Sequence, residues 1–154
     1  MDLIWQELTN GLPDTRQLVT VLIRVIASVV LGGIVGIERE KAGKPAGFRT
    51  HILVSLGTAL VVLACAGSGM SMEGLSRVIQ GIVTGIGFIG AGSILKLDKE
   101  LDIRGLTTAA GLWLTAAVGV ACGLGALGIA MIGAVLALLV LALEGAVQKD
   151  KKQA

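Results

Sequence analysis

Long apolar runs alternate with short charged stretches along this chain. A transmembrane helix needs about 20 mostly apolar residues. Five such runs can be placed, at about residues 18–37, 50–69, 78–95, 106–123 and 126–147. Residues 1–17 form a mixed outer or interfacial segment, residues 148–154 form a basic tail, and we expect no soluble domain after the tail. The pattern predicts an all-α integral membrane protein, a single bundle of five transmembrane helices.

Two local signals support the placement of these helices. Asp14 and Gln17 have the spacing of a helix capping box, so the first helix is expected to begin there. Between the fourth and fifth runs lies only the uncharged, glycine-rich stretch from Cys122 to Ala126. This stretch predicts a tight turn between two antiparallel helices.

The composition agrees with a membrane protein. Hydrophobic residues make up 54% of the chain and charged residues 16%, whereas a soluble domain carries roughly 25% charged residues. Glycine is abundant (23 residues) and proline rare (2 residues), which favours close helix packing over disorder. Aromatic residues make up only 3%, too few for base-stacking surfaces, so we expect the lipid bilayer and no nucleic acid as a partner.

The basic residues are distributed unevenly between the predicted loops. With five spans, one side of the membrane receives Arg39, Lys41, Lys44, Arg49, Lys96, Lys99, Arg104, Lys149, Lys151 and Lys152. The opposite side receives only Arg16 and Arg77. Because cytoplasmic loops carry the excess of Lys and Arg, we expect the amino end outside and the carboxyl end in the cytoplasm.

Small residues form three ridges at four-residue spacing, namely Gly32 with Gly36, Gly81 with Gly85, and Gly119 with Gly123. Such ridges let helix backbones approach closely in membranes, and they favour a homodimer or other homo-oligomer. The third span carries the densest set, Gly81, Gly85, Gly87, Gly90 and Gly92. Plain packing is the first interpretation of this seam; a face toward a pathway or partner, or a broken helix, is the alternative.

The same stretch contains Gly85-x-Gly87-x-x-Gly90, the spacing of a dinucleotide-binding loop. That loop requires a preceding strand and a following acidic residue, whereas these glycines lie within an apolar span. We therefore reject nucleotide binding.

Three polar residues within the spans are candidates for function: Arg24, Thr107 and Thr108. A charge inside the membrane is costly and usually paired or functional. Arg24 is expected to snorkel to the outer surface, with Glu73 or Asp14 as its partner.

A charged cluster is predicted at the inner surface, where the first two spans join and the fourth begins: Glu38, Arg39, Glu40, Arg49, Thr50, His51 and Arg104. Glu38 and Glu40 end one helix and Arg49 starts the next, so each charge opposes a helix dipole and pairing is favoured. Because acids and cations are interleaved, an ion-pair network is favoured over a metal site. Glu38 is the one weak candidate for Mg²⁺. No catalytic group or cofactor-binding motif is recognised, so we expect no enzyme.

Three blocks also carry a family likeness: Gly36–Glu40 with Ala46–His51, Gly85–Gly92, and Arg104–Ala110 followed by Trp113. In order and spacing they resemble the MgtC/SapB family of bacterial inner-membrane proteins. The motif positions that carry over are Glu38, Arg39, Gly47, Arg49, Thr50, His51, Gly85, Gly87, Gly90, Gly92, Arg104, Thr107 and Thr108. Glu73 and Gln80 each stand one residue earlier than the family pattern places an acid and a glutamine.

The resemblance implies a multi-pass protein of the bacterial inner membrane, linked to magnesium homeostasis and, in some members, to virulence. It favours a non-enzymatic modulator of another membrane complex, with the F-type ATP synthase as the implied partner. The alternative is a transporter or channel for Mg²⁺ or another ion, formed by one chain or a homodimer. A third interpretation is that the charged connection only fixes the topology.

Overall fold

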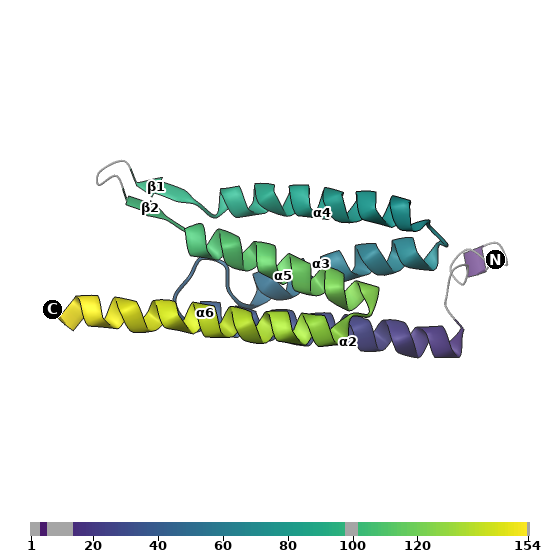
Figure 1. Cartoon of the computed structure of the whole chain (residues 1–154), viewed down its shortest axis with the longest axis horizontal. Helices are drawn as coiled ribbons and strands as arrows, with labels where there is room; N and C mark the ends of the chain where they lie inside the picture. Colours follow the sequence, from purple (N-terminus) through teal and green to yellow (C-terminus); the bar gives the residue numbers. More distant parts are fainter. Residues whose placement is uncertain (1–3, 6–13, 98–101, 154) are drawn as a thin grey trace.

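The computed structural model describes residues 4–5, 14–97 and 102–153, and among them the side chains of residues 4–5, 14–94 and 104–143. In these described residues, the main elements are five long helices and one short hairpin (Figure 1). The helices are α2 (Thr15–Lys41), α3 (Phe48–Gly67), α4 (Met72–Gly92), α5 (Leu106–Leu124) and α6 (Leu127–Gln153). The strands are β1 (Leu95–Leu97) and β2 (Asp102–Arg104).

The helices form an elongated bundle arranged around α5. This helix contacts each of the other four, and α2 and α3 also pack closely against each other. In Figure 1, α5 lies between α4 and α6. The buried apolar core is built mostly of small residues from α2, α3, α5 and α6: Val35, Ala59, Val118, Cys122, Ala130, Ala134, Ala137 and Leu141.

The bundle has the apolar outer surface of a membrane protein. Helices α2, α3, α4 and α5 are each long and apolar enough to cross a bilayer, and the part of α6 with described side chains adds a shorter apolar helix, Leu127–Leu143. Large apolar side chains such as Ile26, Leu53 and Val140 point outward, because lipid surrounds the protein where water would surround a soluble one. The predicted all-α membrane bundle is therefore confirmed.

The helix ends follow from local sequence. The carboxylate of Asp14 accepts a hydrogen bond from the backbone N–H of Gln17 at 2.7 Å, as the capping-box spacing predicted. At the far end of α5, Gly125 adopts a left-handed conformation with φ of 81° and ends the helix. This position favours glycine, which has no Cβ to clash. The tight turn predicted between the last two helices is thus confirmed.

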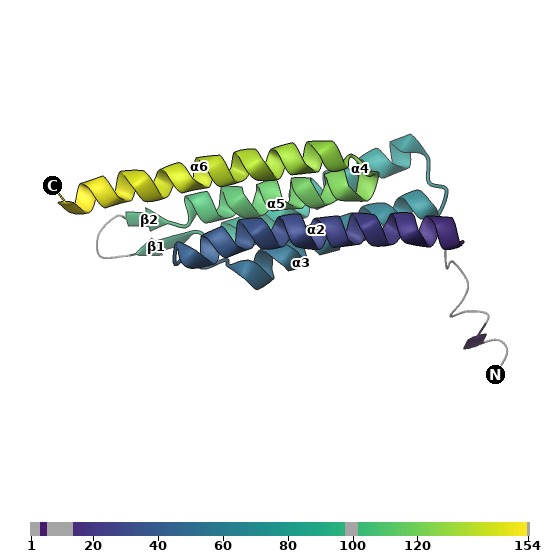
Figure 2. The ribbon, with the colours of Figure 1, turned by 90° about the horizontal axis from the view of Figure 1, so that it is seen from below.

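The third predicted span differs in two ways. Helix α4 is continuous from Met72 to Gly92, so the broken-helix alternative is wrong. The helix also ends before Leu95, which belongs to β1 and pairs with Arg104 of β2 in an antiparallel hairpin. The hairpin, the connection after α2 and the carboxyl end of α6 share one end of the bundle (Figures 1 and 2), which we call the hairpin end.

Candidate functional site

An ion pair within α2 lies against α6 near the hairpin end. The Arg39 side chain is 1% exposed and that of Glu38 is 25% exposed. Both Nε and Nη2 of Arg39 donate to the Glu38 carboxylate, with 2.7 Å between Nη2 and Oε1. Nη2 also donates to the backbone carbonyl of Leu141 at 3.2 Å. Two-point pairing of this kind fixes the guanidinium plane, so Arg39 holds α2 against the backbone of α6.

Glu40 caps the start of the next helix, α3. Its Oε2 accepts a hydrogen bond from the backbone N–H of Phe48 at 2.9 Å. Gly47 is the N-cap of α3 and has no side chain to make this bond. A carboxylate at this position satisfies a free N–H and complements the helix dipole. Glu40 thereby stabilises the connection between α2 and α3.

His51 lies inside the bundle. It is fully buried, and its Nδ1 is 2.7 Å from Oγ1 of Thr115 in α5. The Thr115 hydroxyl donates to the backbone carbonyl of Gly111 at 2.9 Å. His51 therefore belongs to the interface between α3 and α5, one turn inside the start of α3.

The residues of the predicted inner cluster make different contacts. Glu38 and Arg39 pair against α6, Glu40 caps α3 and His51 faces α5. Arg49 and Arg104 are exposed and Thr50 is half-buried. Among the described residues, no three His, Cys, Asp or Glu side chains lie close enough together to hold a metal ion.

Arg24 has a different partner from those predicted. Its Nη1 donates to the backbone carbonyl of Gly123 in α5 at 3.0 Å. Glu73 instead pairs with Arg77, four residues along α4, and Asp14 caps α2. The expectation of Glu73 or Asp14 as the partner of Arg24 is wrong, because a carbonyl at the end of α5 is within its reach.

The three glycine ridges have different environments. A Cβ at Gly32 would lie 2.8 Å from Cβ of Ser55, and one at Gly119 would lie 2.2 Å from the Ser55 carbonyl oxygen. These contacts bring α2 and α5 directly against α3, so packing by the first and third ridges is confirmed. A Cβ at Gly81 or Gly85 would meet nothing within 4 Å.

The rest of the α4 seam also faces away from the bundle, except at one position. Gly87 and Gly92 likewise have open space beside them. At Gly90, a Cβ would lie 3.5 Å from Cβ of Ala109 in α5. Packing within the chain therefore explains Gly90, and it is the wrong explanation for the other four glycines of the seam.

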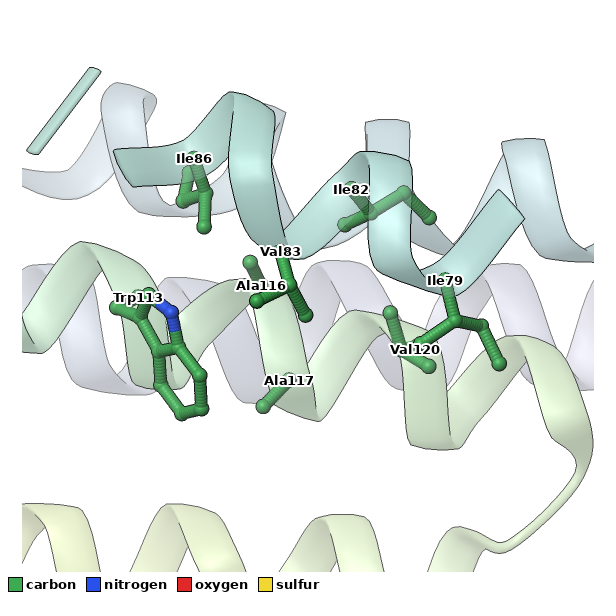
Figure 3. Close-up of a pocket in the computed structure, with 8 residues that line it drawn as sticks. All are labelled: Ile79, Ile82, Val83, Ile86, Trp113, Ala116, Ala117 and Val120. Atoms are coloured by element: carbon green, nitrogen blue, oxygen red, sulfur yellow. The ribbon is translucent and has the colours of Figure 1, made fainter. Parts of the chain in front are cut away.

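Two apolar hollows lie beside α5. A groove of about 120 Å³ separates part of α4 from α5, lined by Ile79, Ile82, Val83, Ile86, Trp113, Ala116, Ala117 and Val120 (Figure 3). A larger cavity of about 280 Å³ lies among α2, α5 and α6 and is lined by Val35, Gly111, Leu141 and other residues. Thr107 contributes the one polar side chain of its lining. Thr108, its neighbour, is buried.

Comparison with known proteins identifies the family to which this chain belongs. A model of the MgtC family matches residues 25–149. The chain belongs to the MgtC family. The family and the helices described above make it a multi-pass protein of the inner membrane. No solved structure matches the chain.

Three relatives show the extent of the similarity. The chain is 42% identical over 127 residues to the Escherichia coli K12 protein named "Putative magnesium transporter YhiD", covering 78% of this chain and 58% of the relative. It is 38% identical over 129 residues to "Protein SrpB" of Synechococcus elongatus, covering 77% and 71%. It is 40% identical over 104 residues to "Protein MgtC" of Salmonella typhimurium, covering 68% and 43%. The chain thus spans about three-fifths of the Escherichia coli relative and less than half of the Salmonella one.

Proposed function

We propose that this protein is a non-enzymatic modulator in magnesium homeostasis, which acts by lateral contact with another membrane protein. Membership of the MgtC family, and a relative whose name includes the words magnesium transporter, support the link to magnesium. The geometry of α4 supports the mode of action.

The open face of α4 is the observation that carries this proposal. Helix α4 packs on α5 and, less extensively, on α3. Its outer face presents Gly81, Thr84 and Gly85, all exposed, with open space beside both glycines. Phe88 follows on the same face and is 84% exposed, more than any other large apolar side chain that the structure describes. A face of small residues lets a second transmembrane helix approach closely.

The buried polar residues support a structural role for the bundle interior. The seam of α3 with α2 and α5 contains Ser55, Thr58 and Thr115, but backbones and side chains are in direct contact there at Gly32 and Gly119. Thr58 and Thr115 donate to backbone carbonyls. A close-packed seam, in which Thr58 and Thr115 are hydrogen-bonded to backbone carbonyls, suits a rigid scaffold that presents α4.

The test compares bulky substitutions on and off the proposed face. Gly81→Leu and Gly85→Leu would fill the space that the partner helix needs. Gly57→Leu in α3 and Gly128→Leu in α6 are matched controls, because both glycines are exposed and have nothing within 4 Å. We expect the α4 variants to lose partner co-purification and growth at low magnesium while the controls retain both. Equal behaviour of all four variants would refute the proposal.

Two kinds of partner are tested, another membrane complex and a second copy of this chain. The F-type ATP synthase, which the family resemblance implies, is the first membrane complex to test by co-purification. A second copy of this chain is the other candidate partner for the open face of α4. Cross-linking through Thr84→Cys, in a chain lacking its native cysteines, separates the two because a homodimer gives a product of twice the monomer mass.

Transport of Mg²⁺ is the second candidate function. The name of the Escherichia coli relative and the carboxylate of Glu38 near the hairpin end favour it. The test is Mg²⁺ flux into sealed proteoliposomes containing wild type or Glu38→Gln, with empty vesicles as the control. Flux above the control that Glu38→Gln abolishes, in protein shown to be folded, would establish a transporter. Flux equal to that of empty vesicles would rule out transport under these conditions and favour the modulator function.

A further inference from the structure

Helix α4 carries polar side chains on the side that faces away from the bundle. Ile82 and Ile86 line the groove against α5 (Figure 3). A position two residues earlier in a helix points to nearly the opposite side, which places Gln80 and Thr84 on the outer face. With the two charged residues before them they form one line at spacings of three or four residues. We call this line the polar stripe of α4; all its members are exposed: Glu73, Arg77, Gln80 and Thr84.

Gln80 is the member of the stripe that the fold of one chain leaves unexplained. It lies more than two turns inside α4, which begins at Met72. Its side-chain amide has no hydrogen-bond partner among the described residues. An amide offers two N–H donors and a carbonyl acceptor, and lipid hydrocarbon satisfies none of them. A partner protein that covers the stripe must therefore bring a polar group to this depth.

A second copy of the chain brings such a group by symmetry. Two copies in the same orientation, related by a two-fold axis along the membrane normal, place equal residues opposite each other. An amide both donates and accepts, so Gln80 can pair with its own equivalent. The Thr84 hydroxyl donates to the backbone carbonyl of Gln80 at 2.9 Å, which leaves its oxygen as a further acceptor.

The rest of the stripe is also compatible with a second copy. Glu73 and Arg77 form an ion pair within α4, so the outer end of the stripe carries both charges and does not repel its equivalent. Gly81 and Gly85 lie beside the stripe with open space next to them. Small residues at four-residue spacing let two helices approach closely enough for hydrogen bonds between them.

We propose that two copies of this chain associate through the polar stripe, with Gln80 of each copy hydrogen-bonded to Gln80 or Thr84 of the other. The inference rests on the proposed function, because it names the partner of the open face of α4. Gln80 determines the specificity of the contact, since a helix without a polar group at this depth leaves the amide unsatisfied.

Energy transfer between labelled copies in lipid vesicles measures the association. The label is placed on Ser68→Cys, at the exposed end of α3 and outside the stripe, in a chain with Cys65 and Cys122 replaced by Ala. We expect energy transfer above the level of random collisions in wild type. In Gln80→Leu we expect association about tenfold weaker, because the hydrogen bonds between the helices are lost. Gln80→Asn keeps an amide and is the matched control, expected to stay near wild type.

The result that overturns the proposal is equally specific. The Gln80 side chain faces away from the bundle, so Gln80→Leu should unfold at the same temperature as wild type and a loss of association cannot be a loss of fold. Energy transfer in wild type at the level of random collisions would overturn the dimer. Equal association of wild type and Gln80→Leu would overturn the role of the amide.

Disulfide cross-linking locates the interface. Phe88 continues the stripe two turns beyond Gln80 and is 84% exposed, whereas Leu53 is 66% exposed on α3. In the chain without native cysteines, we expect Phe88→Cys to give a product of twice the monomer mass and Leu53→Cys to give none. Equal yields from the two variants would overturn the placement on α4.

The dimer and the modulator function can fail separately. A protein that shows no association with itself, but still co-purifies with another membrane complex, would overturn the dimer and leave the modulator function standing. Loss of association in Gln80→Leu with unchanged growth at low magnesium would support the dimer and refute its part in the modulator function.

Discussion

The guanidinium of Arg24 in α2 lies 3.0 Å from the carbonyl oxygen of Gly123 in the last turn of α5. The final carbonyls of a helix have no partner within the helix, and a cation there also complements the helix dipole. Gly125 completes the arrangement, because a Cβ at that position would lie 2.5 Å from Nη2 of Arg24. Arg24 is thus a helix cap contributed by a neighbouring helix.

Removing this cap should loosen the contact between α2 and α5. We expect Arg24→Met to lower the free energy of unfolding by about 1–3 kcal/mol, because the Gly123 carbonyl loses a charged donor. Thermal unfolding of the purified protein in detergent measures the change. Arg16→Met is the control, since Arg16 is exposed in the first turn of α2. Equal stability of the two variants would contradict the capping role.

A methyl group at Gly119 should separate α3 from α5. A Cβ there would lie 2.1 Å from Oγ1 of Thr58 and 2.2 Å from the Ser55 carbonyl oxygen. Overpacking of this kind typically costs about 1–3 kcal/mol. We expect Gly119→Ala to lower the temperature at which the protein aggregates, measured by size-exclusion chromatography after heating. Gly57→Ala, with open space beside it, should be neutral or stabilising by up to about 1 kcal/mol.

Two glutamates allow a direct comparison of a buried and an exposed ion pair. Glu38→Gln leaves the nearly inaccessible Arg39 without its carboxylate, and breaking a buried pair in this way costs about 3–5 kcal/mol. Glu73→Gln breaks a pair whose side chains are 75% and 77% exposed, which contributes at most about 1 kcal/mol. Chemical denaturation in detergent should show the larger loss for Glu38→Gln. Similar losses would mean that Arg39 is held mainly by other contacts.

The orientation in the membrane remains a prediction from the distribution of basic residues. In a chain with Cys65 and Cys122 replaced by Ala, we expect Ser68→Cys to react with a membrane-impermeant maleimide in intact spheroplasts. Lys41→Cys should react only after the membrane is opened. Both positions are exposed. Lys41 ends α2 and Ser68 caps the end of α3, and these two helices run in opposite directions in the bundle (Figure 1). The reverse pattern of labelling would place the amino end in the cytoplasm.

The features that the sequence predicted correctly are local. The length of an apolar run, the Asp14 cap and the turn at Gly125 each depend on a few neighbouring residues. The partner of Arg24 lies 99 positions away, and no local pattern indicates a helix end as an acceptor. Likewise, Gly81 with Gly85 and Gly119 with Gly123 have identical spacing, and only the assembled bundle shows that one ridge is covered and the other open.

Helix geometry separates Arg49 from His51 within the predicted inner cluster. Helix α3 begins at Phe48, and with 3.6 residues per turn Arg49 and His51 point to different sides of it. His51 therefore turns into the bundle toward Thr115 while Arg49 stays exposed. The burial of Arg39 was missed because its carbonyl acceptor belongs to Leu141, 102 positions later.

The central position of α5 has a consequence for how the protein is made. The ribosome produces α2, α3 and α4 before it produces the helix that contacts them all. Helices α2 and α3 can associate at once, because Gly32 and Gly36 fit directly against α3. Until α5 is made, α4 has only its smaller contact with α3, and Arg24 lacks the Gly123 carbonyl. Biogenesis of this bundle therefore includes a closing step, in which α5 completes contacts that α2, α3 and α4 left open, before α6 is added.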